Sequence, residues 1–479
     1  MGLQSLLIPL SSPTLHDILI FFIIVVAAYM VKFYYAYFTH ENKLPGPFPL
    51  PLIGNLYFLY RELDDILFDL QEKYGSKLVE FYIGSERKIC IGDANLLEDI
   101  NKYSSNELAG KGIGFNNNLE SWKHNKAFLA QSIMTPSFWK EYIKEIEMIF
   151  EDSIKLMESK QQSSSFDINF KEWAVRLLAI EGYTKEPISK ELSYKINIWI
   201  KSIIFHRLLP KFIATYVPPF NLFKKKYLKN DEWLKKYFDD LVEKRREEIN
   251  QMKKYNSDIL TTLICANTKN KLKDEEIRII IYETFIGIST TTNSVSFLVY
   301  LLCKNPLIKE KVYAEIDKVF HNDKTRPITY DDISTIKLPY TEACVNESLC
   351  LISTVLYTLR CAIDDGNACS FNWKAGQKFI VHYNFIHLNK KHWEDPVKFN
   401  PERFIKNDEY IEKNSFILFG GGNKMCPARL LAMNSIKIII VLFFRKYDIE
   451  LVESEAPLKR SCVLLINECK ELKVRIIPR

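Results

Sequence analysis

Residues 419–429 read Phe-Gly-Gly-Gly-Asn-Lys-Met-Cys-Pro-Ala-Arg, and an apolar run of helical character follows from Leu430 to Phe444. Glycines lack a side chain, so this loop can approach a flat ligand closely and turn its backbone N–H groups toward a sulfur atom. Cys426 would then lie at the start of a helix, where the positive end of the helix dipole favours a thiolate. A buried free thiol in a turn would produce the same local pattern. The loop makes Cys426 a candidate ligand. Other segments of the chain must distinguish a ligand from a buried free thiol.

The composition indicates a large globular protein that does not bind nucleic acid. The chain has 479 residues, of which 47% are apolar, and its net charge of +6 arises from 65 basic and 59 acidic residues. Both signs are dispersed along the sequence, whereas a nucleic-acid surface would concentrate the basic residues. The ten cysteines lack the CxxC pairs and histidine spacings of a zinc site, and their scatter is typical of a protein in a reducing compartment.

The first forty residues differ from the rest of the chain. Ile18 to Val31 contains no charge, and the apolar run resumes after Lys32, which is long enough to cross a bilayer if the lysine reaches the membrane surface. Asp17 precedes the run and Lys43 follows it, so the positive-inside rule places the remainder of the chain in the cytosol. A cleaved signal peptide is the alternative, but there is no basic leader and no clear A-x-A site. We expect an uncleaved, single-pass membrane anchor over residues 1–40.

Alternate prolines follow in residues 43–54, which read Lys-Leu-Pro-Gly-Pro-Phe-Pro-Leu-Pro-Leu-Ile-Gly. Proline fixes φ and lacks a backbone donor, so we expect a stiff, extended strut. The segment can be a simple linker, a spacer that sets the angle of the globular part over the membrane, or both. We place a proline-rich hinge at residues 41–55 and one globular domain at residues 56–479.

The globular part has the sequence pattern of a mainly α fold with small β-sheets, of the α+β class. Leu78–Ile83 and Lys88–Ile91 alternate in polarity around residues 84–87 and predict a hairpin. Helical periodicity is clearest in three long segments, residues 141–160, 232–253 and 274–303. Strand-like patterns return at Gln377–Val381 and near the C terminus, and the sequence contains no internal repeat.

The segment Asp274–Cys303 predicts a helix about 45 Å long that crosses the centre of the domain. It stops before Pro306 and contains Gly287-Ile-Ser-Thr-Thr-Thr292, a poor helix-forming sequence. Hydroxyl groups there could hydrogen-bond to carbonyls that a local groove or distortion sets free. A polar patch at a contact between helices is the alternative.

Taken in order along the chain, these segments resemble the cytochrome P450 family. Residues 419–429 are similar to the family's FxxGxxxC loop, with Lys424 at the basic position two residues before the cysteine. Residues 399–404 (FNPERF) are similar to the PERF segment, and residues 340–349 resemble the helix with the ExxR motif. Gly287 and Thr290 match the oxygen-binding helix, and residues 122–126 (WKHNK) resemble the WxxxR helix. With the anchor and hinge, the resemblance covers essentially the whole chain and implies the cytochrome P450 fold.

The resemblance implies haem b (iron protoporphyrin IX) as cofactor, with Cys426 as the axial ligand of the iron. A cysteine thiolate pushes electron density onto iron and favours O–O cleavage, which indicates activation of dioxygen. Phe419, Gly420 and Gly422 would line the haem on the cysteine side.

The resemblance also assigns residues to the edge and the far face of the haem. The two propionates would be bound by Trp122, Lys126, Arg360 and Lys424. Thr290, flanked by Gly287 and Ser289, would lie beside bound dioxygen, where its hydroxyl could order water and deliver protons.

The ExxR helix departs from the family pattern. Cys350 occupies the arginine position, so Glu347 keeps Arg403 as a partner but loses the second cation. Leaving a buried carboxylate with one partner removed costs roughly 3–5 kcal/mol unless water or another cation compensates.

Two further departures concern charge near the haem. Ser289 replaces the acid that usually precedes the threonine. Glu283 lies two turns before Thr290 on the same helix face, and is an alternative proton source or a buried or capping carboxylate. Lysines at positions 126 and 424 replace arginines, which exchanges rigid forks for point charges.

We expect a monooxygenase of the endoplasmic reticulum membrane that inserts one atom of dioxygen into a lipophilic small molecule, with electrons from an NADPH-dependent reductase. The alternatives are a haem-thiolate isomerase or dehydratase that acts on a peroxide, and a catalytically degraded haem-binding protein. Cys426 and Thr290 favour the monooxygenase, whereas Cys350 and Ser289 favour the degraded protein.

Partner surfaces can be suggested, but the substrate cannot be named. An acidic reductase would meet basic residues near the cysteine, for which the candidates are Lys123, Lys424, Arg429 and Lys437. The apolar segment Trp199–Tyr227 either dips into the bilayer surface or forms core between two helices. By resemblance, Asn106–Leu119 lines the substrate site.

Overall fold

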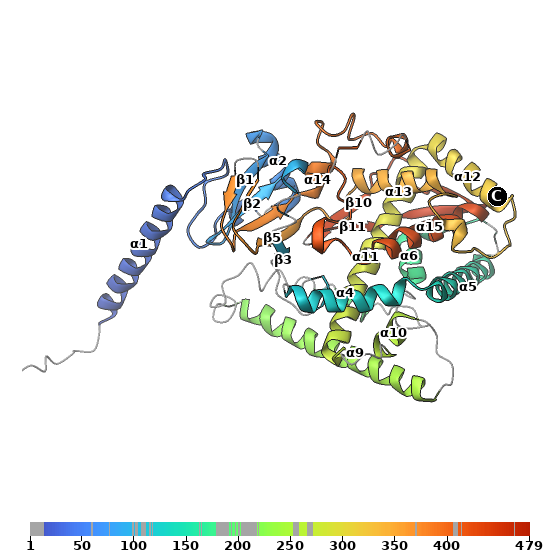
Figure 1. The fold of residues 1–479 in the computed structure, drawn as a ribbon, viewed down its shortest axis with the longest axis horizontal. Helices are drawn as coiled ribbons and strands as arrows, with labels where there is room; N and C mark the ends of the chain where they lie inside the picture. The colour runs from blue at the N-terminus through green and yellow to red at the C-terminus, as the bar shows by residue number, and fades with distance from the viewer. Residues whose placement is uncertain are drawn as a thin grey trace, which may run out of the picture.

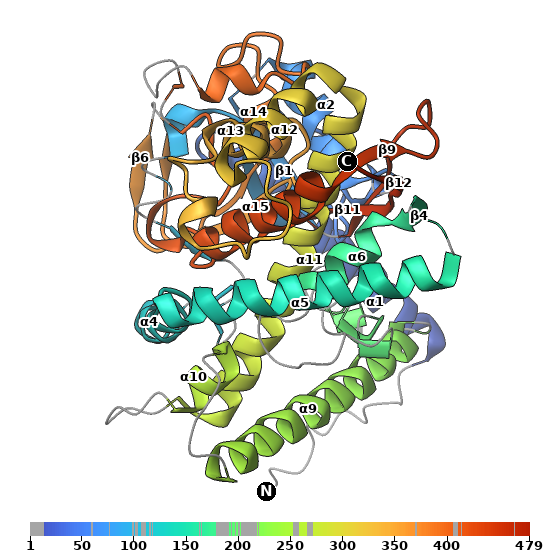
Figure 2. The same ribbon diagram turned by 90° about the vertical axis from the view of Figure 1, so that its right-hand side faces the viewer.

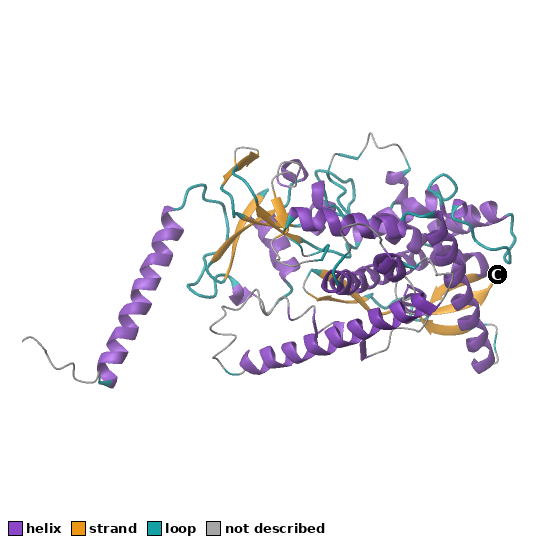
Figure 3. Ribbon diagram, turned by 60° about the horizontal axis from the view of Figure 1, so that its bottom comes forward, coloured by secondary structure: helices purple, strands orange, loops and turns teal. Residues whose placement is uncertain are grey.

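The computed structural model has a helical body, a five-stranded sheet at one end of it, and a long helix that projects beyond the sheet (Figure 1). The structure describes residues 14–479 except 59–60, 76, 98–99, 101–103, 107–111, 115, 117, 162, 164, 179–190, 193, 197, 200–201, 203–217, 219, 252–257, 266–271, 369–370, 406–410, 413 and 464. Within this part of the chain helices predominate and the sheets are small, which confirms the predicted fold class (Figure 3).

The helices are bounded as follows: α1 Leu15–Thr39, α2 Leu63–Tyr74, α4 Leu119–Ile133, α5 Pro136–Gln161, α6 Phe170–Leu178, α9 Phe220–Gln251, α10 Ile259–Cys265, α11 Asp274–Lys304, α12 Pro306–Phe320, α13 Pro339–Leu351, α14 Tyr383–His387 and α15 Arg429–Lys446. Of the predicted helices, the central one is reproduced to within one residue. The helix α9 begins twelve residues before the predicted start at Glu232, because its first turns expose Lys and Leu side chains and so lack the apolar stripe that marks the rest.

The strands are β1 Leu78–Ile83, β2 Glu86–Ile91, β3 Ser104–Asn106, β4 Phe166–Asn169, β5 Thr358–Ala362, β6 Gly366–Ala368, β7 Phe371–Trp373, β8 Lys378–Val381, β9 Tyr447–Leu451, β10 Lys459–Val463, β11 Ile466–Glu471 and β12 Lys473–Pro478. The largest sheet has the order β1-β2-β8-β5-β3, in which only β2 and β8 are parallel. The predicted hairpin is confirmed as β1–β2, with a tighter turn at Gly84-Ser85. The smaller sheets are β4-β12-β9, β10-β11 and β6-β7.

Helix α11 crosses the body and contacts α6, α9, α13 and α15 (Figure 2). Every side chain from Thr291 to Val299 is buried, so this part of the helix is surrounded by protein. The buried hydroxyls return hydrogen bonds to carbonyls of the preceding turn, as from Thr292 to Ile288 and from Ser296 to Thr292. The hydroxyl-rich sequence therefore forms an uninterrupted helix without leaving buried hydroxyl groups unpaired.

Two helices of the described chain, α1 and α11, are long and apolar enough to cross a membrane. The apolar window of α11 is 72% buried inside the body, whereas none of that of α1 is buried. Helix α1 begins with a capping box between Thr14 and Asp17, and its 25 residues span roughly 37 Å. This helix has the length and the exposed apolar surface of the expected anchor.

The second half of α1 packs on the β1–β2 hairpin through aromatic rings. Phe33 and Tyr37 lie 6.3 and 5.8 Å from the ring of Tyr82, and Tyr34 stacks on Phe48 of the proline segment at 5.4 Å. At the end of the helix, His40 lies 3.3 Å from the carboxylate of Glu80. The end of α1 is therefore held against the globular domain.

The proline-rich segment is extended only in its first part. Residues 43–49 lie outside helix and strand, as expected, but the chain then reverses so that Leu50 and Gly54 exchange hydrogen bonds of 2.9 and 2.7 Å. Leu52 and Gly54 have positive φ in this turn. Asn55 fixes the reversal, because its side-chain amide donates to the Pro47 carbonyl and accepts from the Tyr82 N–H. Alternate prolines predicted the extended part but gave no sign of the turn.

Candidate functional site

The cysteine loop, residues 419–428, includes the short 3-10 helix Gly422–Lys424 and ends where α15 begins. The Cys426 N–H donates to the Phe419 carbonyl at 2.9 Å, which closes the loop on itself. Gly420 and Gly422 have φ of +74° and +62°, a region that residues with a side chain rarely adopt. Two of the three glycines are therefore required by the backbone, and Cys426 is held just before α15.

The space in front of Gly420 is bordered by the guanidinium of Arg360. A Cβ atom at Gly420 would lie 3.2 Å from the Tyr383 hydroxyl and 3.7 Å from Arg360 Nη2. Arg360, on β5, is only 4% exposed, and its Nε has no hydrogen-bond partner. Within the part of the chain that the structure describes, no carboxylate pairs with this buried cation. Such a group is costly unless an anion binds it.

Two lysines lie over the ring of Trp122, and one of them, Lys424, is close enough to Arg360 to interact with its charge. The ring is buried in α4, and the Nζ atoms of Lys424 and Lys126 lie 4.3 and 4.7 Å from its centroid, within the range of cation–π contact. Burial, together with the charges of Arg360 and Lys126, lowers the pKa of Lys424 to about 8, against the opposing effect of Glu283. The structure brings these residues together, and their cluster has an excess of positive charge.

Burial raises the pKa of the Cys426 thiol, and the Ala428 N–H, Lys126 and Arg429 oppose this effect. The protein alone therefore favours the neutral thiol, and a bound metal cation is what would hold it as a thiolate. A flat, dianionic, metal-containing cofactor meets both requirements: its metal would take the sulfur and its carboxylates would take the cations. The residues present thus fit a haem.

On α11, Thr290 donates to the Gly287 carbonyl at 2.8 Å, and Thr291 donates to the same oxygen at 2.9 Å. A Cβ atom at Gly287 would meet no atom of the described residues within 4 Å, so this part of the structure leaves open space beside the turn. Helix α11 is uninterrupted at this turn. The predicted distortion of the helix is therefore excluded, whereas the predicted local groove agrees with the open space. Ser289 and Thr290 are half-buried. From Thr291 onward, the alternative interpretation is correct: the hydroxyl-bearing residues form a polar patch where α11 contacts other helices.

Glu347 of α13 meets Arg403, as predicted. Its Oε2 lies 3.0 Å from Arg403 Nε without forming a directed hydrogen bond, while its Oε1 accepts from the Asn400 N–H at 2.8 Å. The Cys350 thiol, where the family has arginine, instead faces the His387 carbonyl at 3.6 Å. Burial raises the pKa of Glu347 to about 7, against the effects of the Asn400 N–H and Arg403. Without the arginine that Cys350 replaces, the negative charge of the Glu347 carboxylate is poorly compensated.

This pKa predicts that stability depends on pH. The folded state holds the Glu347 proton up to about pH 7, whereas the unfolded chain releases it near pH 4.5, so the stabilisation is complete below pH 4.5 and is lost as the pH rises through 7. We expect the free energy of unfolding to fall by up to about 3 kcal/mol over this range through this group. Denaturant unfolding from pH 4.5 to pH 8 measures it, and Glu347→Gln should flatten the curve.

Glu310→Gln, at an exposed position of the neighbouring α12, is the matched control and should keep the wild-type slope. Equal slopes for wild type and Glu347→Gln would show that Glu347 is ionised at neutral pH.

The predicted reductase surface requires a correction. Lys437 is 2% exposed and pairs with Glu342 at 2.8 Å, because its position on α15 faces the body. Lys424 is turned inward, toward Trp122 and the Asn116 carbonyl. Only Lys123 and Arg429 of the four candidates are exposed.

Of the contacting residues, Tyr383 was absent from the sequence prediction, whereas residues 112–114 and Asn116 fall in the segment Asn106–Leu119 that the resemblance assigned to the substrate site, and only their partners were not predicted. Tyr383 lies beside Gly420 and Arg360, and the backbone of residues 112–114 and Asn116 contacts Glu283 and Lys424. The carboxylate of Glu283 is half-buried and accepts from the N–H groups of Ile113 and Gly114, so of the roles considered a buried carboxylate agrees with the structure, and the role of proton source stays a prediction. Most of the apolar segment Trp199–Tyr227 falls outside the described residues.

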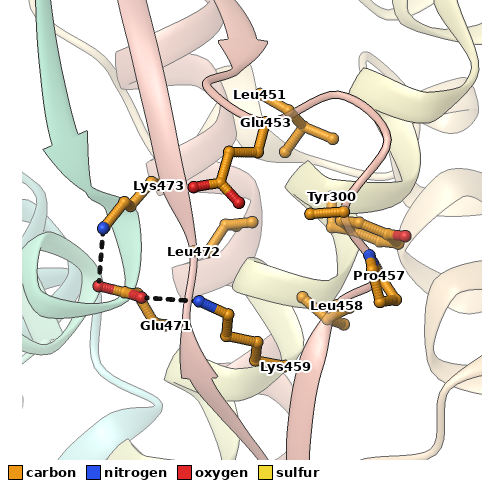
Figure 4. A pocket seen from close by; sticks show the side chains of 10 residues that line it. Tyr300, Leu451, Glu453, Pro457, Leu458, Lys459, Glu471, Leu472 and Lys473 are labelled. Atoms are coloured by element: carbon orange, nitrogen blue, oxygen red, sulfur yellow. Dashed lines mark ion pairs between the residues drawn. The ribbon is translucent and has the colours of Figure 1, made fainter.

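A separate pocket lies at the C-terminal end of α11, beside β9 and β10 (Figure 4). Tyr300, Leu451 and Leu458 are among its lining residues, and Glu471 pairs across the rim with Lys459 and Lys473 at 3.5 and 3.6 Å. It shares no residue with the cysteine loop or the cation cluster, so it is not part of the candidate site.

Comparison with known proteins agrees with this geometry. The sequence model of the cytochrome P450 family matches residues 44–474. Cytochrome P450 3A16 of Mus musculus is 24% identical over 95% of this chain and 96% of its own length, and probable cytochrome P450 516A1 of Dictyostelium discoideum is 25% identical over 88% and 91%. The crystal structure of the cytochrome P450DA heme domain superposes with a TM-score of 0.75 at 18% identity, over 91% of this chain and 98% of that one. At that identity the structural likeness shows the fold.

Proposed function

Since the chain belongs to the cytochrome P450 family, we propose that it is a membrane-anchored haem-thiolate monooxygenase in which Cys426 ligates the haem iron and a lipophilic small molecule is the substrate. The family uses iron protoporphyrin IX and has monooxygenase activity. Bound haem supplies the activation of dioxygen, and a thiolate ligand favours O–O cleavage.

The observation that supports this proposal most is the pairing of the half-buried Cys426 thiol with an excess of positive charge, which comes from the buried Arg360 and two half-buried lysines. Arg360 would bind one propionate with its unpartnered edge, and Lys126 and Lys424 would bind the other beside the Trp122 ring. Lysines are point charges, so their hold on a carboxylate is less directional than that of an arginine fork. Gly420 and Gly422 keep the loop free of side chains where the cofactor would approach.

On the α11 side, the group that would donate protons to bound dioxygen is the least complete part of the site. The Thr290 hydroxyl donates to its own helix, and it can accept a hydrogen bond from a water molecule in the space beside Gly287. Ser289 supplies no carboxylate. We infer that protons reach this space through water held by Thr290, and that turnover is slower than in relatives with an acid at position 289.

One observation favours the second candidate, a haem-binding protein without turnover. Glu347 has lost one of its two expected cations, and its raised pKa shows that Arg403 compensates it only in part. Among the described residues, no hydrogen bond or ion pair joins Glu347 or Arg403 to Cys426 or to the cation cluster. We therefore rank the monooxygenase first.

The membrane assignment extends beyond α1. Figures 1 and 2 place the start of α9 toward the side from which α1 projects, and this start exposes Leu222, Phe223 and Leu228 beside three lysines, Lys224–Lys226. Apolar side chains with adjacent lysines suit the surface of an anionic bilayer. We propose an endoplasmic reticulum anchor with the catalytic domain in the cytosol, where an NADPH-dependent reductase meets the surface that includes Lys123 and Arg429.

The test of catalysis is turnover in reconstituted membranes. The full-length protein with an NADPH-dependent reductase is expected to transfer one atom of isotopically heavy dioxygen into a member of a panel of lipophilic compounds, detected by mass spectrometry. Thr290→Ala should lower product formed per NADPH consumed, because the water that it orders is lost. A correctly ligated haem that is reduced by the reductase but labels no compound in a broad panel would favour the haem-binding protein.

A further inference from the structure

The backbone just before α4 forms hydrogen bonds with both sides of the candidate site, α11 and the cysteine loop. The N–H groups of Ile113 and Gly114 donate to the carboxylate of Glu283 on α11, the second at 2.9 Å. From the opposite side, the Lys424 ammonium of the cysteine loop donates to the Asn116 carbonyl at 2.6 Å. Hydrogen bonds to ionised groups are about twice as strong as those between neutral groups. A short stretch of backbone is thus joined by charged groups to both α11 and the cysteine loop.

Gly112 allows this close approach. A Cβ atom at this position would lie 2.2 Å from Glu283 Oε2, a distance that no side chain tolerates, so the carboxylate would have to move. Gly112 is buried, and its carbonyl lies 3.4 Å from the side-chain amide of Asn125 on α4. The sequence Gly112-Ile113-Gly114 is therefore shaped to receive a carboxylate on its N–H groups.

The carboxylate lies along the open side of α11. Glu283, Gly287 and Thr290 are spaced by four and three residues, so they share one face of the helix. The space beside Gly287 is open, and it begins one turn from the carboxylate that holds residues 112–114. Residues 113 and 114 therefore contact α11 one turn before the space at Gly287.

We propose that Glu283 is a positioning residue that holds residues 112–114 against α11, and that a ligand reaches the haem iron rapidly only when these hydrogen bonds open. The inference rests on the proposed function, because it takes the space beside Gly287 as the chamber in which ligands meet the iron. Glu283 is half-buried, so its carboxylate can be released to water when the loop moves. The residue then determines access to the chamber without touching the reacting atoms.

The experiment is stopped-flow binding of 4-phenylimidazole to the full-length ferric holoprotein in detergent. Glu283→Ala is expected to raise the association rate by roughly tenfold or more, because both charge-assisted hydrogen bonds are lost. Glu283→Gln keeps a side-chain acceptor at the same place, and should remain within about threefold of wild type. The midpoint of thermal unfolding should be the same for Glu283→Ala and Glu283→Gln. A general structural defect in one of them would lower its midpoint.

Gly112→Ala provides an independent variant that retains the Glu283 side chain but displaces its carboxylate sterically. It is expected to behave like Glu283→Ala, while Glu275→Ala, at an exposed position in the first turn of α11, should behave like wild type. Wild-type association rates in both Glu283→Ala and Gly112→Ala, with an unchanged Soret band, would overturn the inference. A wild-type protein without a thiolate-ligated Soret band would contradict the proposed function instead, and this is seen before any kinetic measurement.

Discussion

Cys426→Ala is expected to abolish thiolate ligation of the haem and to lower monooxygenase turnover by roughly a thousandfold or more. The Cys426 N–H bond to Phe419 is a backbone contact, so the substitution removes the sulfur without removing the contact that closes the loop. The cation cluster also remains, so some haem should still bind. The ferrous carbon monoxide spectrum and turnover with reductase measure the two effects.

Cys265→Ala, at an exposed thiol far along the chain from the loop, is the matched control and should leave both quantities unchanged. Retention of a thiolate spectrum in Cys426→Ala would show that another cysteine is the ligand.

Arg360→Leu is expected to change the stability of the protein in opposite directions with and without haem. In the apoprotein the substitution removes a buried guanidinium whose Nε has no partner, so the unfolding midpoint should rise. In the holoprotein it removes a charge-assisted contact with a propionate, which contributes roughly 1.5–3 kcal/mol, so haem should dissociate about ten to a hundred times faster. Thermal unfolding of the apoprotein and haem transfer to apomyoglobin measure the two effects.

Arg460→Leu, at an exposed position on β10, controls for the loss of one positive charge and should change neither quantity. If Arg360→Leu destabilised the apoprotein and left the haem off-rate unchanged, Arg360 would be a structural residue with no role at the cofactor.

Helices and strands were predictable from the sequence where burial of one face produces a regular spacing of apolar residues. Alternation of apolar residues identified the β1–β2 hairpin, and the long apolar pattern identified α11 almost to the residue. The glycines of the cysteine loop were predictable for a similar reason, because positive φ at Gly420 and Gly422 is a local backbone requirement. Such features depend on the residues that form them and little on the rest of the chain.

Contacts between distant segments were accessible only through the family resemblance. It paired Glu347 with Arg403 and grouped Trp122, Lys126, Arg360 and Lys424, which come from one helix, a strand and a loop. No periodicity could have brought these residues together, because their approach is decided by how the elements pack.

The errors arose where a side chain's direction depends on its neighbours. Lys437 was assigned to the surface because lysine is usually exposed, yet its helix is buried on that face and Glu342 compensates its charge. The reversal of the proline segment depends on Asn55 bonding to β1, and the role of Glu283 depends on backbone N–H groups that have no sequence signature.

The most direct test of the central claim is the ferrous carbon monoxide difference spectrum of the full-length protein, supplied with haem and reduced with dithionite. We predict a strongly red-shifted Soret band, because Cys426 would be held as a thiolate on the iron beside the cluster of Arg360, Lys126 and Lys424. A band at the position of imidazole or neutral thiol ligation, or no uptake of haem, would contradict the account.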